Sequence, residues 1–282
     1  MNILIWSKGP YYNDYMLKDT TYIEDEEVLK EHIKKYNGDI LWIRNGNEEN
    51  CDLDILSKNI DLITKPTMLI TSDGDRCVPS QYKPNTVKTI LNCENIIKWK
   101  TQNYDGTIEH KKIEYYPIGF DFHTSCNIEN KMMYMFHSKL NSRTKIDDLI
   151  LCDAHTNLTP LREDIFSKFI NNDRFRFIKE RLTYTHITDL YNQFLFVISP
   201  EGNGIDCHRT WELFLAGCIV IKKKSTLDRM FIDNDLPVVL IDEWEDLNEN
   251  LEIKLEKWKT EYIKYTDIFT IYKKLQTNYW LR

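Results

Sequence analysis

The stretch Ser199–Ile221, SPEGNGIDCHRTWELFLAGCIVI, decides the fold. It continues the apolar run Phe194–Ser199, which is typical of a strand covered on both faces. Pro200 ends this run, a Gly-Asn-Gly loop follows, and apolar residues then recur at helical spacing. Gly217 ends the helix, and the next apolar run starts at Cys218. The stretch therefore predicts a strand, a loop, a helix and a second strand, as in a parallel sheet.

The same alternation extends along the chain. The predicted strands are the apolar runs Ile3–Trp6, Ile40–Arg44, Met68–Thr71, Ile113–Pro117, Leu149–Cys152, Phe175–Ile178, Phe194–Ser199, Cys218–Lys222 and Val238–Ile241. The predicted helices between them are Glu24–Tyr36, Gln81–Leu91, Leu161–Ile170, Ile187–Tyr191, Cys207–Ala216 and Leu227–Phe231. Two such sets predict an α/β protein with two Rossmann-like domains facing a cleft.

The predicted domain boundaries follow from these sets. The first domain takes residues 1–125, a polar crossover takes 126–147, and the second domain takes 148–260. A C-terminal helix follows at 261–282, within a charged and aromatic helical stretch that starts at Trp244 and is broken once. The prediction allows these last helices to cross back to the first domain.

Composition narrows the class of protein. The 282 residues are 42% hydrophobic and 29% charged, with a net charge of −7. That balance argues against a broad electrostatic surface for nucleic acid or anionic membranes, although a local basic site can still bind a small anion. No run approaches the roughly 20 apolar residues of a membrane span, and the N-terminus lacks the features of a signal peptide. We expect a cytoplasmic protein, while an anchor in a longer parent chain stays open.

The seven cysteines are an odd number, form no CxxC pair and lie in part within apolar runs. This pattern favours reduced, buried thiols over a disulfide framework or a zinc site.

Polar residues gather at the start of the helix in the opening stretch. Asp206 is placed to cap it, while His208, Arg209 and Glu212 share one surface. A glycine loop before a helix N-terminus suits phosphate, to which Arg209 adds a bidentate cation. Glu212, one turn further, is placed to accept hydrogen bonds from a ribose diol. Phosphate and ribose together indicate a nucleotide, and the alternative is an Arg–Glu pair on a solvated helix face.

The residues around this helix resemble a region of a known protein family. The stretch Ser199–Ile221, with RLTYTHITDLYNQF before it and LPVVLIDEW after it, resembles the donor-site region of exostosin-like glycosyltransferases of the GT-B architecture over residues 194–244. The resemblance implies a nucleotide-sugar donor, with uridine as the first base and guanosine as the second. It implies that Arg209 binds the diphosphate and Glu212 the ribose. Gly202, Asn203 and Gly204 would form the wall of the site, and Asp206 and His208 would act as cap, orienting group or direct contact.

Further candidates lie at other strand ends. Arg162, in the segment CDAHTNLTPLRED with His155, is a second candidate for binding phosphate. Asp73 and Asp75 flank Gly74 in a DxD pattern, which suits a turn, a general base or acceptor contact, or a metal ligand.

Other candidates lie at three further places in the chain. Asp121 and His123 are alternative bases near the predicted crossover. Trp42, with Arg44 and Asn45, ends a strand where it could stack on an acceptor sugar, and Lys222–Lys224 is expected to be a solvated turn.

Together these features predict a hexosyl- or pentosyltransferase. It would move a sugar from a nucleotide-sugar to a hydroxyl of a glycan or glycoprotein, with inversion. No essential cofactor or metal, nucleic-acid partner or membrane span is expected. One alternative is a metal-dependent GT-A-like transferase that uses Asp73 and Asp75. Another is a nucleotide-sugar-binding protein without catalysis.

Overall fold

The computed structural model describes residues 4–8, 26–46, 51–122, 134, 144–153, 160–178, 180 and 182–282. They form two compact units. Unit 1 holds the described residues up to Ile118 together with the segment Asn203–Asp206. Unit 2 holds the described residues from Gly119 to Gly202 and from Cys207 to Arg282. The first unit therefore ends before the boundary predicted at residue 125, and it includes a segment from the glycine loop.

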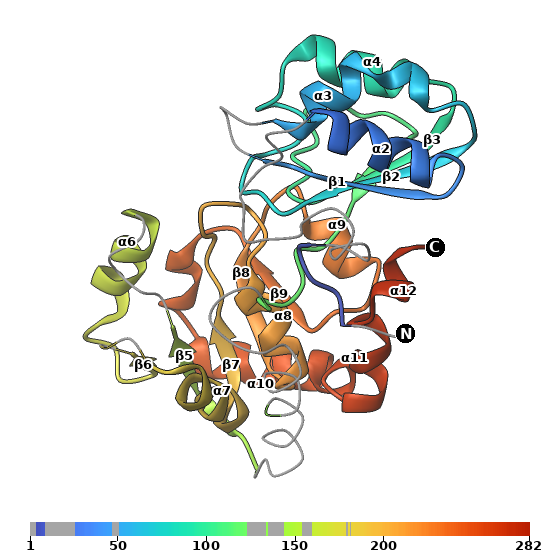
Figure 1. Cartoon of the computed structure of the whole chain (residues 1–282). Coiled ribbons are helices and arrows are strands. Elements are labelled where there is room, and N and C mark those ends of the chain that lie inside the picture. Colours follow the sequence, from blue (N-terminus) through green and yellow to red (C-terminus); the bar gives the residue numbers. More distant parts are fainter. Residues whose placement is uncertain are drawn as a thin grey trace. The chain divides into compact units, whose positions relative to one another are not determined.

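Unit 1 is built on a parallel sheet with the strand order β1-β2-β3-β4. The strands are β1 (Ile40–Arg44), β2 (Thr67–Ser72), β3 (Ile96–Thr101) and β4 (Ile113–Tyr115). The helices are α2 (Glu26–Tyr36), α3 (Asp52–Lys58), α4 (Pro84–Asn92) and the 3₁₀ turn η1 (Ile60–Leu62). Helix α3 contacts both α2 and α4, and the three lie together above the sheet in Figure 1.

Two elements of unit 1 were not predicted. Strand β3 reads IIKWKT, and its two lysines interrupt the apolar pattern although Trp99 between them is fully buried. Lys98 and Lys100 instead pair with Glu114 of the neighbouring strand, at 3.0 and 3.8 Å. The short helix α3 was not predicted because acidic residues in its first turn interrupt the apolar periodicity of the sequence. In the predicted strand Ile3–Trp6, Leu4 and Trp6 form buried β-bridges, and Ile3 lies outside the described residues.

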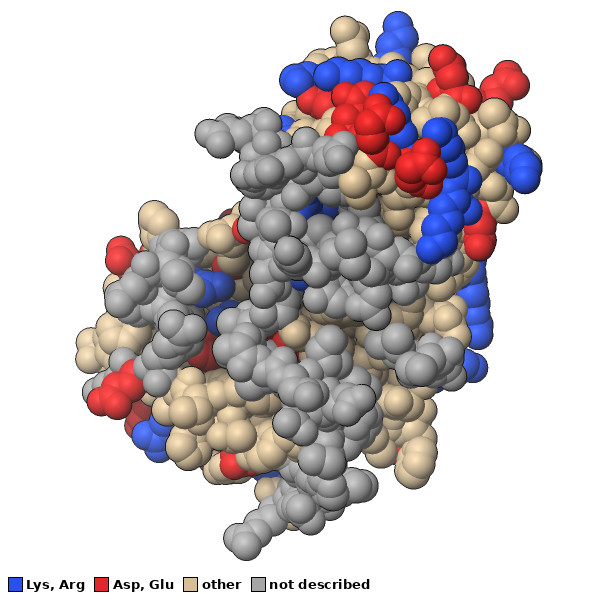
Figure 2. Space-filling view, viewed as in Figure 1, with Lys and Arg blue, Asp and Glu red and all other residues tan. Residues whose placement is uncertain are grey.

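Charged side chains on unit 1 alternate in sign. On α2, Lys30 pairs with Glu26 and Glu27, and Lys34 pairs with Glu31. Figure 2 shows the resulting red and blue atoms side by side over this helix. Exposed pairs at this spacing stabilise a helix only weakly. This surface is a solvated helix face.

Unit 2 is built on a second parallel sheet with the strand order β6-β5-β7-β8-β9. The strands are β5 (Ile146–Cys152), β6 (Phe175–Phe177), β7 (Phe194–Ile198), β8 (Ile219–Lys223) and β9 (Val238–Ile241). The prediction of two parallel α/β sheets with Rossmann-like alternation is thereby confirmed.

Helices cover both faces of this sheet. They are α6 (Pro160–Phe169), α7 (Tyr184–Gln193), α8 (His208–Leu215), α9 (Asp228–Ile232) and α10 (Leu251–Tyr262). Ile150, Phe196 and Ile219 pack into one cluster with residues of α6 and α10. The intervening side chains, such as Val197 and Val220, point to the opposite face, where α7, α8 and α9 contact β7, β8 and β9.

The C-terminal segment is broken more than once. After β9 come η2 (Trp244–Leu247), α10, η3 (Ile263–Tyr265), α11 (Ile268–Lys274) and α12 (Thr277–Trp280). Helix α11 contacts α8, and the ring of Trp280 meets that of Trp211 edge to face at 5.7 Å. These contacts place the segment in unit 2. None of the described helices is both long and apolar enough to cross a membrane.

The strand order of unit 2 contains a topological switch point. After β5 the chain moves outward to β6 and then returns to form β7 on the other side of β5. The connections after β5 and after β7 therefore leave the sheet in opposite directions. In open parallel sheets, ligands bind outside the carboxyl ends of the strands at such a switch point.

Candidate functional site

The carboxyl ends of β5 and β7 bring together the candidate donor-binding residues. Asp153 follows β5 directly, and Ser199–Gly202 follows β7. Arg162 comes from α6 and Arg209 from α8, the helices that follow these two strands. The sequence predicted both arginines at strand-to-helix junctions, and the strand order explains why the two junctions meet.

Arg209 is held by a carboxylate. Its Nε lies 3.1 Å from Asp153 Oδ2, and the Tyr191 hydroxyl donates to the same oxygen. Asp153 is 3% exposed and Tyr191 is also buried. The arginine is therefore not part of a solvated helix pair, which was the alternative interpretation of the sequence.

The electrostatics keep Arg209 charged. Burial lowers the pKa of Arg209, but the charge of Asp153 and the interactions with Tyr191 outweigh burial and raise it above its ordinary value. The Nη1 atom is buried and has no hydrogen-bond partner among the described residues. Because a buried donor without a partner is costly, this atom is a ready contact for an anion.

Arg162 is a second cation at this edge. It is 5% exposed, and its Nε donates to the carbonyl of Glu201 at 3.3 Å. Burial, followed by repulsion from Arg209, lowers the pKa of Arg162 below its ordinary value. Two guanidinium groups that repel one another, that of Arg162 buried and that of Arg209 with 12% of its side chain exposed, favour a ligand carrying negative charge.

Gly202 leaves room beside these cations. A Cβ at this position would lie 3.5 Å from Arg162 Nη2 and 3.4 Å from Cys207 Sγ. The predicted role of Gly202 as part of the wall of the site fits this position.

Helix α8 begins later than predicted. It runs from His208 and its N-cap is Cys207, without a side-chain cap. Asp206, predicted as the cap, instead accepts a hydrogen bond from the backbone of Ile118 at 2.9 Å, so that prediction is wrong. The N-cap thus lies one residue beyond the acid, and the carboxylate of Asp206 bonds within unit 1.

His208 and Glu212 remain on α8. His208 Nδ1 lies 2.8 Å from the carbonyl of Gly119, and because a carbonyl only accepts, Nδ1 carries the proton. The orienting and direct-contact roles of His208 both stay predictions. Glu212 is half-buried, three residues from Arg209 on the same helix. The i, i+3 spacing keeps the two on one surface.

The rest of the glycine loop lies in unit 1. Asn203 Nδ2 lies 3.3 Å from Asp75 Oδ2, and the backbone of Asp206 donates to Asn103 Oδ1 at 3.0 Å. A Cβ on Gly204 would lie 2.5 Å from Asn103 Nδ2. The loop predicted to form one wall is therefore divided, with Gly202 beside Arg162 and Asn203–Asp206 within unit 1.

The carboxyl edge of the unit 1 sheet carries the predicted acids. Asp73, after β2, has a left-handed backbone with φ of +65°. Its carboxylate lies 3.5 Å from Lys8 Nζ and 3.4 Å from Ser7 Oγ. The Gln102 side chain accepts from the Asp73 backbone and donates to the Gly74 carbonyl, at 3.0 and 2.9 Å. A strained residue held from several sides is typical of functional positions.

Asp75 differs from Asp73 in its surroundings. It is exposed, and its carboxylate accepts from Asn203. Within the part of the chain that the structure describes, no three His, Cys, Asp or Glu side chains are grouped to hold a metal ion.

The other sequence candidates have varied outcomes. Asp121 is half-buried and follows Phe120, whose ring stacks on Phe122, while His123 and His155 lie outside the described residues. Trp42 is fully buried and donates to Ser72, and Arg44 is buried against Asp52 at 3.2 Å. The prediction that these two side chains contact an acceptor is therefore wrong.

The prediction of a solvated lysine turn is also wrong in part. Lys222 lies within β8, is 2% exposed and has its Nζ 3.4 Å from the carbonyl of Ser199. Lys223 and Lys224 do reach the surface, where they pair with Glu243 and Asp242. The cysteines were predicted to be reduced and in part buried. The six described cysteines form no disulfide with one another, and Cys152, Cys207 and Cys218 are buried.

Sequence reasoning missed Asp153 and Tyr191. Asp153 carried a usable signal, since an acid directly after a buried parallel strand lies at the ligand-binding edge of the sheet. Tyr191 carried none, because an apolar ring on an amphipathic helix predicts a core position.

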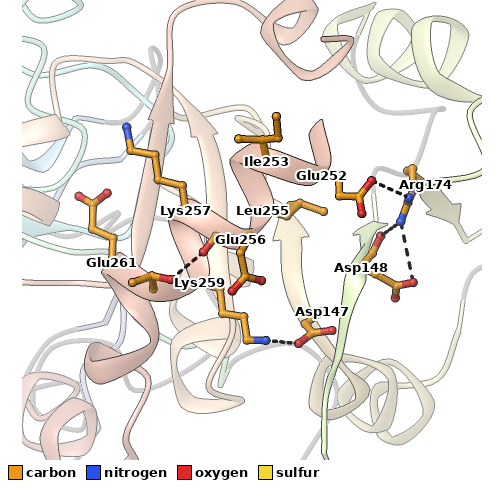
Figure 3. A pocket seen from close by; sticks show the side chains of 11 residues that line it. Asp147, Asp148, Arg174, Glu252, Ile253, Leu255, Glu256, Lys257, Lys259 and Glu261 are labelled. Carbon is orange, nitrogen blue, oxygen red and sulfur yellow. Dashed lines mark hydrogen bonds and ion pairs between the residues drawn. The ribbon is translucent and has the colours of Figure 1, made fainter. Parts of the chain in front are cut away.

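A groove of about 810 Å³ lies elsewhere in unit 2. Figure 3 shows it lined by α10 and by Asp147 and Asp148, at the amino end of β5. Lys259 pairs with Asp147 at 2.6 Å, and Arg174 lies 3.5 Å from Glu252. Since it lies at the amino end of β5 and not at the carboxyl edge of the sheet, we do not assign the donor to it.

Comparisons with known proteins give only distant likenesses. No protein-family model and no curated protein matches the chain. Among solved structures, WaaG, a glycosyltransferase involved in lipopolysaccharide biosynthesis, matches with a TM-score of 0.36 and 12% identity, over 76% of this chain and 65% of that one. The pneumococcal O-GlcNAc transferase GtfA in complex with UDP and GlcNAc matches with a TM-score of 0.44 and 10% identity, over 91% of this chain and 58% of that one.

A third match is the UDP-GlcNAc 2-epimerase from Methanocaldococcus jannaschii, with a TM-score of 0.36 and 13% identity, over 87% of this chain and 81% of that one. The chain thus spans less than two thirds of the length of WaaG and of GtfA. Likenesses of this size carry no information about activity, which has to be inferred from the residues of the site.

Proposed function

We propose that this protein is a GT-B-type, exostosin-like glycosyltransferase that moves a sugar from a nucleotide-sugar to a hydroxyl of a glycan or glycoprotein. The observation that carries the proposal is the pair of mutually repelling guanidinium groups at the β5/β7 switch point, of which Arg162 is buried and Arg209 is 12% exposed at its side chain. A diphosphate offers the negative charge and the bidentate oxygens that such a pair binds. The backbone N–H groups at the start of α8 add further donors.

Glu212 supplies the second half of the donor contact. Its carboxylate, half-buried on α8 beyond Arg209, accepts hydrogen bonds from the two ribose hydroxyls. The proposed donor is a UDP-sugar first and a GDP-sugar second, as the exostosin resemblance implies.

Asp73 of unit 1 is the proposed general base. It takes the proton of the acceptor hydroxyl, whose oxygen attacks the anomeric carbon while the bond to the diphosphate oxygen breaks. The diphosphate leaves with the bonding electrons, and the anomeric centre is inverted. Arg162 and Arg209 stabilise the developing charge, so that the proposed reaction needs no essential metal. Asp75 and Asp121 are the alternative bases.

The test is a calorimetric titration of the wild-type chain and of Arg209→Ala with UDP, GDP, ADP and NAD. We expect saturable binding of one nucleoside diphosphate and its loss in Arg209→Ala. Arg174→Ala is the matched control, because Arg174 also pairs with acids in unit 2 but lies at the other end of β5. Equal or absent responses across the four ligands would contradict the proposal.

Two further measurements separate the alternatives. A metal-dependent GT-A-like transferase using Asp73 and Asp75 would lose activity in EDTA, whereas the proposed enzyme keeps it. A non-catalytic nucleotide-sugar-binding protein would bind the donor but release no nucleoside diphosphate when acceptors are added.

A further inference from the structure

Arg209 is held in place by residues from two other elements. Asp153 lies at the end of β5 and Tyr191 belongs to α7, while Arg209 belongs to α8. Both Arg209 Nε and the Tyr191 hydroxyl donate to the same oxygen, Asp153 Oδ2. The carboxylate is therefore fixed by two donors that approach from different helices.

This contact uses one edge of the guanidinium group and leaves the other. A guanidinium is planar and carries its five N–H groups in a fixed fork. With Nε engaged by Asp153, the plane of the group is set, and the Nη1–Nη2 edge is directed away from the bond to Asp153. Nη1 has no hydrogen-bond partner among the described residues. That edge is the one that can bind two oxygens of an anion side by side.

We propose that Asp153 and Tyr191 are positioning residues that hold the Arg209 guanidinium with its Nη1–Nη2 edge presented to the diphosphate. The identity of the ligand rests on the proposed function, whereas the restraint on Arg209 does not. Preorganisation of this kind raises affinity because the long side chain loses its freedom before the ligand arrives.

The hydroxyl of Tyr191 is suited to this role. Burial, followed by the charge of Asp153, raises the pKa of Tyr191 well above its ordinary value. The hydroxyl therefore stays protonated and remains a donor throughout the neutral range. Phenylalanine fills the same space without the donor, so Tyr191→Phe removes one hydrogen bond with little change in packing.

The restraint is tested without any ligand. In ¹⁵N side-chain spectra, the proton of a hydrogen-bonded arginine Nε–H exchanges slowly with water and gives a sharp signal. The signal of Arg209 is assigned as the one that is missing from the spectrum of Arg209→Lys. We expect this signal to be sharp in the wild-type chain, weakened in Tyr191→Phe and lost in Asp153→Asn. An unchanged signal in both variants would overturn the proposal, and so would a signal already averaged in the wild-type chain.

The consequence for binding is tested by titrating the same variants with UDP. The Tyr191 hydrogen bond to the Asp153 carboxylate acts on the ligand only through Arg209, so its loss predicts about three- to tenfold weaker binding in Tyr191→Phe, and loss of the carboxylate charge predicts more than about tenfold in Asp153→Asn. Tyr279→Phe is the control for a lost hydroxyl, since Tyr279 donates to Asn234 at 2.9 Å. Asp147→Asn is the control for a lost carboxylate, because Asp147 pairs with Lys259 at the opposite end of the same strand.

A structural role alone does not account for chemical rescue. In Arg209→Ala, added guanidinium ion should restore part of the UDP affinity, since Asp153 and Tyr191 still hold a cation there. The double variant Arg209→Ala/Asp153→Asn should not be rescued. Rescue that is equal in both variants would contradict positioning by Asp153. If the wild-type chain binds no nucleoside diphosphate, the proposed function fails, and the spectra alone decide on the restraint.

Discussion

The carboxyl edges of the two sheets differ in charge although both sheets are parallel. In unit 2 the edge holds the guanidinium groups of Arg162 and Arg209, with Asp153 between strand and helix. In unit 1 it holds Asp73 and Asp75, with the amides of Gln102 and Asn103 beside them. The backbone differs too, since Asp73 and Asn103 both have left-handed φ, of +65° and +52°.

Because of this difference in charge, two parallel sheets of the same architecture suit different chemical groups at their carboxyl edges. Cations at the end of a parallel sheet suit a diphosphate, whereas the carboxylate of Asp73, beside Lys8 and two amides, is the proposed acceptor of a hydroxyl proton. This contrast is the reason for proposing the donor half in unit 2 and the acceptor half in unit 1. Four substitutions would break or sharpen this contrast.

Asp73→Asn should have the largest effect. Asparagine tolerates the left-handed backbone and keeps the size of the side chain, but it cannot accept a proton. We expect turnover to fall about 10²- to 10⁴-fold, which is the usual contribution of a general base. The measurement is steady-state release of the nucleoside diphosphate in the presence of acceptor.

The control for Asp73→Asn is Asp105→Asn. Asp105 is also an acid of unit 1, but its carboxylate accepts from Ser80 and Thr107. Turnover that stays unchanged in Asp73→Asn would move the base to Asp75 or Asp121.

Arg162→Met should separate binding from stability. The variant removes the repulsion between Arg162 and Arg209, and replacement of a buried charge by an apolar side chain of similar size is often neutral or stabilising. We expect UDP to bind about 10- to 100-fold more weakly, since a charge-assisted contact contributes about 1.5–3 kcal/mol. Thermal unfolding should show no loss of stability. A clear drop in melting temperature would mean that Arg162 serves the fold rather than a ligand.

Gly204→Ala and Gly202→Ala test the division of the glycine loop. At Gly204 a methyl group would meet the buried Asn103 amide at 2.5 Å, so unit 1 should lose about 1–3 kcal/mol of unfolding free energy. At Gly202 the nearest atoms are at 3.4 and 3.5 Å, and we expect stability to change little while UDP affinity falls. Denaturant unfolding and titration of both variants check this, and the reverse order of stability would contradict it.

The smallest predicted effect is that of Asp54 on the free energy of unfolding at acidic pH. Burial raises the pKa of Asp54, but hydrogen bonds from Lys83 and Thr86 outweigh it and leave the pKa below its ordinary value. The depressed pKa contributes stability that is present above about pH 4 and is lost as pH falls through the folded-state value.

Asp54 is half-buried, but its partner Lys83 is exposed and solvent screens the pair, so the contribution of Asp54 should stay below about 1 kcal/mol. Asp54→Asn should flatten the acid limb of unfolding measured between pH 5 and pH 2, and Asp61→Asn on the same surface is the control. A limb of unchanged steepness in Asp54→Asn would contradict the prediction.

Much of the fold could be predicted because local periodicity reports burial. Strands β1, β2, β4 and all five strands of unit 2 lie within predicted apolar runs or overlap them. Strand β3 escaped because Lys98 and Lys100 pair with Glu114 across the sheet, a compensation that periodicity cannot show. The cap at Asp206 was wrong for a similar reason, since its partner Ile118 is far away in sequence.

The sequence by itself determined the alternation of strands and helices, the two α/β sets, and the placement of Arg162 and Arg209 at strand-to-helix junctions. Only the tertiary structure decided that β5 lies between β6 and β7, that Asp153 and Tyr191 hold Arg209, and that Asn203–Asp206 belongs to unit 1. The physical reason is the range of the interactions. Periodicity records which side of an element is buried, whereas strand order and contacts between loops depend on residues far apart in the chain.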